Sequence, residues 1–132
     1  MPQLTLKLLV DEYAVGQLKT LTPQLLDKLS GGFYTITHTQ DEISVVCQSE
    51  LFQQQTALEY EHCEFGWRCF KIDQVLAFEQ IGIIAGLSNV LKAAEVSLFV
   101  ISTYNTDYLL VKEESHNTAC QALVEAGYII DR

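Results

Sequence analysis

The chain has 132 residues, 48% of them hydrophobic and 19% charged, which suits one ordinary domain or two very small ones that share a core. With only 2 Pro and 7 Gly, it lies far from disordered and collagen-like compositions. Its net charge of −9 repels phosphate backbones and anionic lipid surfaces, so we expect neither nucleic acid nor a membrane as a partner. Because no charge-free stretch is long enough to cross a bilayer and no basic, apolar leader opens the chain, we expect a cytoplasmic protein.

The first half of the chain predicts a strand, a helix and a hairpin. The helix begins at a proline and ends before a Gly-Gly pair, both of which are typical of helix boundaries. The predicted elements are a strand at Tyr13–Leu18, a helix at Pro23–Leu29, and strands at Phe33–Thr37 and Glu42–Val46. The glutamine-rich stretch from Gln53 to Glu64 is the expected join to the second half, with a short strand around Ala57–Tyr60.

The second half alternates strand-like and helix-like hydrophobic periods more clearly. Gly127 suits the left-handed position that ends a helix. The predicted elements are strands at Trp67–Ile72, Val75–Phe78, Val96–Ser102, Asp107–Lys112 and Tyr128–Asp131, with helices at Ile83–Ala94 and Ala119–Ala126. The order βαββαβ predicts an α+β fold, in which a four-stranded antiparallel sheet carries both helices on one face.

The first half resembles a diverged copy of the second. A shift of 65 positions aligns Phe33–Thr37 with Leu98–Ser102, and Glu42–Val46 with Asp107–Val111, without a gap. Two hairpins of equal length can also agree this far through hydrophobic patterning alone. We therefore expect two subdomains, at residues 1–62 and 63–132, and internal duplication is the favoured explanation.

The sequence offers little for catalysis or for a metal. Its four cysteines form no CxxC pair, and Cys47 and Cys120 lie on apolar faces, so we expect reduced, buried thiols. His62, Cys63 and Cys69 do not match the usual zinc spacings. No phosphate-binding loop, nucleophile elbow or catalytic histidine pairing is present, so we expect no enzyme, cofactor or metal.

Two polar segments are expected at the same end of the second subdomain. The segment Gln80, Ile81, Gly82, Ile83 and Ile84 leads into a helix, whose first amides and positive dipole end suit a carboxylate. Thr103, Tyr104, Thr106 and Asp107 lie at the tip of the hairpin and add one carboxylate. Together they predict a ligand pocket for an amino acid, with Asp107 holding an ammonium or guanidinium group. The alternative is that Asn105, Thr106 and Asp107 are turn formers only.

These same segments resemble the ACT-domain family. The similarity is carried by Gly66-Trp67-Arg68, by Gly82 with its apolar helix, and most specifically by Ile101–Glu113. It extends to Tyr13–Val15 and to the first hairpin. The chain is similar to short bacterial proteins of two tandem ACT domains and to one half of the animal cytosolic arginine sensors. The resemblance implies tandem ferredoxin-like βαββαβ modules that bind amino acids at domain or subunit interfaces.

Three functions follow from these observations, and the first is favoured. It is a regulatory protein that senses a free amino acid, arginine-like or small, through a homodimer or a regulated protein partner. The second is a dimeric adaptor built on ACT domains that no longer binds a ligand. The third is an enzyme that uses a cysteine, or a histidine with an acid, and nothing in the sequence places such groups together.

Overall fold

The structure is a computed structural model that describes residues 4–53, 59–74 and 82–132. Its internal contacts divide the chain into an inserted unit, Asp11–Trp67, and a split unit made of Met1–Val10 with Arg68–Arg132. The boundary at residue 62 would assign the first ten residues to the first subdomain. They belong instead with the C-terminal half, because β1 (Thr5–Leu8) pairs there with β5 (Tyr60–Ile72). No helix among the described residues is long and apolar enough to cross a membrane.

The inserted unit is an antiparallel sheet with two short helices. Its strand order is β3-β4-β2-β5, and the first part of β5 contributes the last strand. Its other elements are β2 (Tyr13–Leu18), α1 (Pro23–Leu29), β3 (Thr35–His38), β4 (Ile43–Gln48) and α2 (Ser49–Gln53). The predicted bounds of β2 and α1 are confirmed, whereas α2 was not predicted.

Local sequence explains the position of α1. Thr22 caps its start, because its Oγ1 accepts a hydrogen bond from the amide of Leu25 at 3.3 Å, and Pro23 occupies the first turn, where no amide is needed. Leu25 and Leu29 are one turn apart, so both enter the core of the unit.

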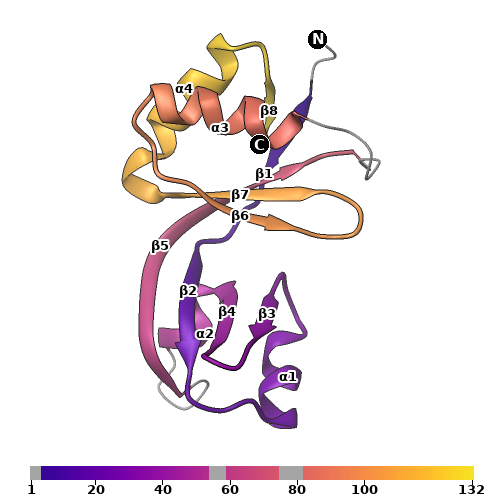
Figure 1. Cartoon of the computed structure of the whole chain (residues 1–132), viewed down its shortest axis with the longest axis vertical. Coiled ribbons are helices and arrows are strands. Elements are labelled where there is room, and N and C mark those ends of the chain that lie inside the picture. The colour runs from indigo at the N-terminus through magenta and orange to yellow at the C-terminus, as the bar shows by residue number, and fades with distance from the viewer. Residues whose placement is uncertain (1–3, 54–58, 75–81) are drawn as a thin grey trace. The chain divides into compact units, whose positions relative to one another are not determined.

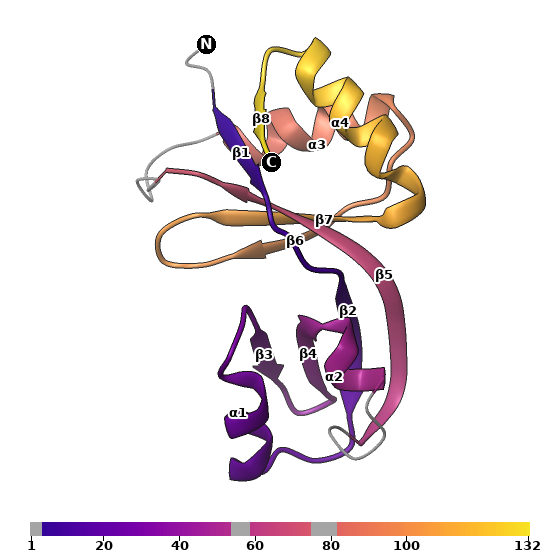
Figure 2. The same cartoon turned by 180° about the vertical axis from the view of Figure 1, so that it is seen from behind.

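The split unit contains a five-stranded sheet with the order β6-β7-β5-β1-β8. Its remaining strands are β6 (Phe99–Ser102), β7 (Asp107–Lys112) and β8 (Ile129–Asp131). The prediction of four antiparallel strands was incomplete, because β1 lies between β5 and β8 and pairs in parallel with β8. Figures 1 and 2 both show β1 in that place. Hydrophobic burial explains why β1 lies between β5 and β8, since the alternate residues Leu4, Leu6 and Leu8 are buried in the core of this unit.

The helices of the split unit cover one face of its sheet, as predicted (Figure 1). They are α3 (Ile83–Ala93) and α4 (His116–Glu125), and a single 3₁₀ turn, η1 (Glu113–Ser115), precedes α4. Leu87 and Leu91 of α3 meet Leu123 of α4 over Phe70 and Leu109 of the sheet. Gly127 ends α4 with a φ of +101°, which confirms the predicted left-handed residue.

Two expectations about the middle of the chain need revision. Strand β5 begins at Tyr60, so most of the described part of the expected join is strand and the predicted start at Trp67 was seven residues late. The expected strand at Val75–Phe78 lies outside the described residues, as does the first half of the expected strand at Ala57–Tyr60.

The two hairpins match at a shift of 64 positions, and the predicted shift of 65 was wrong by one. Thr35 pairs with Val46 as Phe99 pairs with Leu110, and the other three pairs follow at the same spacing. The burial of β4 and β7 is also identical along the strand. A shift of 65 equates Ile36, which packs on the core, with Ile101, which pairs with Tyr108 on the other face. A one-residue slip reverses the face of every side chain in a strand.

All four cysteines are free thiols, and three of them are buried. Burial raises the pKa of Cys47 and of Cys69 to about 12, and it also raises the pKa of Cys120. Cys63 is only half-buried. The expectation of reduced apolar cysteines is in accord with these positions, because Cys47 and Cys120 lie in the two cores.

We predict that one thiol of the native protein reacts rapidly with a thiol reagent and that the other three react slowly. At pH 8 a buried thiol with a pKa of about 12 is almost entirely protonated, and the thiolate is the reactive form. Titration with a chromogenic disulfide reagent should therefore modify Cys63 first, and all four only after denaturation. Uniform rapid labelling of the native protein would contradict these burial assignments, and a Cys63→Ser variant identifies the fast group.

We also predict that Gly16→Ala destabilises the inserted unit. An added Cβ would lie 2.5 Å from Cζ of Phe52, and that ring is held edge-on by Tyr60 and Phe65. Urea denaturation should show a loss of about 1–3 kcal/mol, the cost of overpacking a core. Gly31→Ala is the matched control, because nothing lies within 4 Å of its Cβ. Equal urea-denaturation midpoints for the two variants would show that the Phe52 ring moves aside without a loss of stability.

Candidate functional site

The tip of the β6–β7 hairpin is a closed, self-bonded loop. The amide and Oγ1 of Thr103 both donate to the carbonyl oxygen of Thr106, each at 2.9 Å, and Oγ1 of Thr103 accepts from the Thr106 amide at 3.4 Å. Tyr104 projects from this loop with 81% of its surface exposed. The side chain of Thr103 thus closes the turn.

Thr106 also joins the hairpin to the central strand. It is 4% exposed, and its Oγ1 donates to the carbonyl oxygen of Ile72 at 2.8 Å. Ile72 is the last residue of β5, the strand that precedes α3. The hairpin loop and the exit from β5 therefore lie at the same end of the sheet, as Figures 1 and 2 both show.

Asp107 begins β7 directly after this junction. It is half-buried and pairs with Ser102 across the hairpin. Because Asp107 alternates with Leu109 and Val111, its side chain belongs to the sheet face that carries α3 and α4. A carboxylate thus stands at the end of the sheet where β5 leads toward α3.

The start of α3 contributes backbone amides to this end. Gly82 caps the helix with a φ of +86°, a left-handed conformation that favours glycine. The Gly86 amide donates to the Gly82 carbonyl at 2.8 Å, so the amides of Ile83 and Ile84 precede the first bond of the helix. The side chains of Ile83 and Ile84 pack on the core, and only their amides are suited to a ligand. Gln80 and Ile81 lie outside the described residues.

The hairpin of the inserted unit repeats the loop but not its chemistry. Thr39 bonds the carbonyl of Glu42 through both its amide and its Oγ1, as Thr103 bonds Thr106. At the shift of 64, the exposed Glu42 replaces the buried Thr106, and Ile43 replaces Asp107. The equivalence of Glu42 with Asp107 that the sequence alignment implied is therefore wrong. In the inserted unit this position is apolar.

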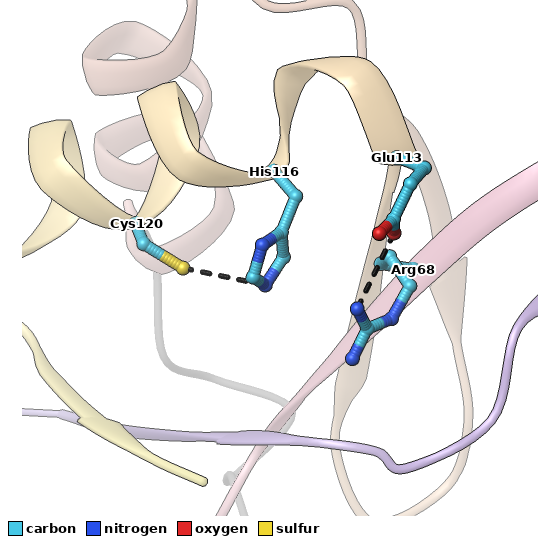
Figure 3. Close-up of polar contacts among 4 residues, drawn as sticks. All are labelled: Arg68, Glu113, His116 and Cys120. Carbon is cyan, nitrogen blue, oxygen red and sulfur yellow. Dashed lines mark hydrogen bonds and ion pairs between the residues drawn. The ribbon is translucent and has the colours of Figure 1, made fainter.

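A second polar cluster, which was not predicted, surrounds the start of α4 (Figure 3). His116 is 7% exposed, lies parallel to Phe70 at 6.0 Å between ring centroids, and has its Nε2 3.6 Å from Sγ of Cys120. Beside His116, Nη1 of Arg68 lies 3.3 Å from Oε2 of Glu113 and forms an ion pair with it. Burial raises the pKa of the Cys120 thiol, and the nearby Arg132 and Arg68 only oppose that effect. The cluster packs α4 on the sheet through the contact between His116 and Phe70. At the shift of 64 positions, His116 is equivalent to Phe52 of the inserted unit.

The described residues hold no further concentration of reactive groups. No three of their His, Cys, Asp or Glu side chains converge as metal ligands would. An open depression of about 570 Å³ lies at the far end of α3, between its last turn and β6, and Lys92, Glu95 and Val100 are among the residues that line it.

Comparison with known proteins identifies the family. A model of the ACT domain matches residues 62–125, and a model of an N-terminal domain matches residues 11–54. The human protein named cytosolic arginine sensor for mTORC1 subunit 1 is 32% identical over 95 residues, which make up 69% of this chain and 29% of the sensor. The mouse sensor is 33% identical over 103 residues, or 75% and 28% of the two chains. The aligned part thus covers less than a third of these relatives.

Solved structures agree over nearly the whole chain. An Agobacterium tumefaciens protein is 30% identical, has a TM-score of 0.82, and is matched over 98% of this chain and 93% of its own. The ligand-free regulatory subunit of aspartate kinase from Thermus thermophilus has a TM-score of 0.63 over 89% and 93% of the two chains, and at 9% identity it supports the fold alone. The sequence matches agree with the mixed α/β fold of the two units, and the chain is a member of the ACT-domain family.

Proposed function

We propose that the protein is a regulatory module that senses a free amino acid in the split unit. One observation carries the proposal: the hydroxyl of Thr106 bonds Ile72, so that the Asp107 carboxylate stands at the end of the sheet where β5 leads toward α3. The proposal draws further support from relatives named as a cytosolic arginine sensor, which are about one third identical to this chain over the aligned part.

The two halves of this site suit the two charges of an amino acid. The first amides of α3 and the positive end of its dipole attract an α-carboxylate. Asp107 attracts a cation, either the α-ammonium group or a basic side chain such as a guanidinium. A backbone site recognises the group that all amino acids share, while a single carboxylate selects for positive charge.

We further propose that the functional form is a homodimer that acts on a protein partner. The arginine sensors are more than three times as long as the part that this chain matches. Self-association would place a second copy of the domain pair beside the first, where it completes the pocket. Binding then changes the stability of the dimer or its affinity for the regulated partner, as linkage between two sites requires.

We predict that one amino acid, with arginine tested first, raises the melting temperature of the purified protein. A ligand at about 100 times its dissociation constant adds roughly 2.7 kcal/mol of stability. Differential scanning fluorimetry against all twenty amino acids at millimolar concentration, with titration calorimetry of any positive result, measures the effect. Absence of a shift and of binding heat across the set would overturn the sensor proposal and leave the adaptor without ligand as the explanation.

We predict that Asp107→Asn weakens this binding about 10- to 100-fold, because a hydrogen bond between charged groups contributes about 1.5–3 kcal/mol. The amide keeps the shape of the side chain and removes its charge. Asp41→Asn, in the hairpin loop of the inserted unit, is the matched control and should bind as the unmodified protein does. If calorimetry gives Asp107→Asn an unchanged affinity, the pocket lies elsewhere.

A further inference from the structure

We infer that Thr106 is a positioning residue, which holds Asp107 against the end of β5 and does not itself touch the ligand. The inference rests on the proposed function for its consequence in binding. It changes the role that the sequence assigned to Thr106, from ligand contact to structural anchor.

Every polar group of Thr106 already has a partner within the protein. Its carbonyl accepts two bonds from Thr103, its amide donates to Oγ1 of Thr103, and its hydroxyl donates to Ile72. At 4% exposure, the side chain has almost no surface to offer a ligand. A buried hydroxyl without a partner is costly, so the bond to Ile72 accounts for the presence of threonine where valine would fill the same space.

The acceptor is the point at which β5 ends. The Ile72 carbonyl accepts both the Thr106 hydroxyl at 2.8 Å and the amide of Gln74 at 2.9 Å, so both of its lone pairs are used. The amide of Asp73 donates to Thr5 of β1 at 2.8 Å. Thr106 therefore joins the hairpin to a hydrogen-bonded corner of the sheet, and Asp107, the next residue, takes its position from that corner.

The inserted unit provides an internal comparison. Its hairpin has the same register and the same threonine-closed loop, but Glu42 at the equivalent position is exposed, and Ile43 follows it. A hairpin of this shape thus forms without the buried hydroxyl. The anchor occurs in the hairpin that carries a carboxylate at the next position, which links it to the placing of that carboxylate and not to hairpin formation.

The test compares Thr106→Val with Thr106→Ser. Valine keeps the volume and removes the hydroxyl, whereas serine keeps the hydroxyl. We expect Thr106→Val to lower the affinity for the amino acid at least tenfold, and Thr106→Ser to stay within about threefold of the unmodified protein by calorimetry. Ile130→Val, a small core truncation in β8 of the same unit, is the control for general destabilisation and should leave the affinity unchanged.

Amide hydrogen exchange of the ligand-free variants tests the anchor separately. Thr106→Val should lose protection at the amide of position 106, which bonds Thr103, and at that of Gln74, which bonds Ile72, while Thr106→Ser and Ile130→Val keep it. Unchanged protection at both amides, or an affinity loss in Ile130→Val equal to that in Thr106→Val, would overturn the inference. If the unmodified protein binds no amino acid, the proposed function fails, and the exchange comparison still decides whether Thr106 anchors Asp107.

Discussion

The antiparallel pairing of β1 with the second part of β5 is the contact on which the rest of the split unit depends. It brings the first residues of the chain beside a strand more than sixty positions later, with Leu6 opposite Ile72 and Leu8 opposite Phe70. These side chains belong to the core that packs between the sheet and both helices. The same pairing gives β8 a parallel neighbour and fixes the end of β5 through the bond from Asp73 to Thr5. The candidate site is built on that end.

The two units show how one backbone supports different chemistry. Their hairpins share register, burial and a loop closed by threonine, so the local frame does not depend on the residues that follow the loop. In one unit the first residue of the second strand is isoleucine, and in the other it is aspartate. The buried hydroxyl of Thr106 accompanies the aspartate. The two units thus share the hairpin frame and differ in the side chain at this position.

Sequence patterns predicted most elements because each depends on local forces. The proline and glycine boundaries of α1 and the left-handed residue at Gly127 are properties of a few neighbouring residues, and both agree with the structure. The ACT-domain motif around Ile101–Glu113 identified the family. By contrast, β1 escaped prediction, because its partner residues in β5 lie more than sixty positions away, and the five-residue helix α2 escaped it too.

The sequence by itself thus determined the family, the βαββαβ order of the second half and the two segments of the candidate site. Only the tertiary structure decided the register of the two hairpins, the place of β1 and the hydrogen-bond partners of Thr106. The reason is physical: a strand is periodic at two residues, so alignments one position apart look equally hydrophobic, and only cross-strand pairing shows which side chains face the core. The hydrogen bond of Thr106 could not be predicted either, because its acceptor, Ile72, lies 34 residues away and becomes a neighbour only in the folded sheet.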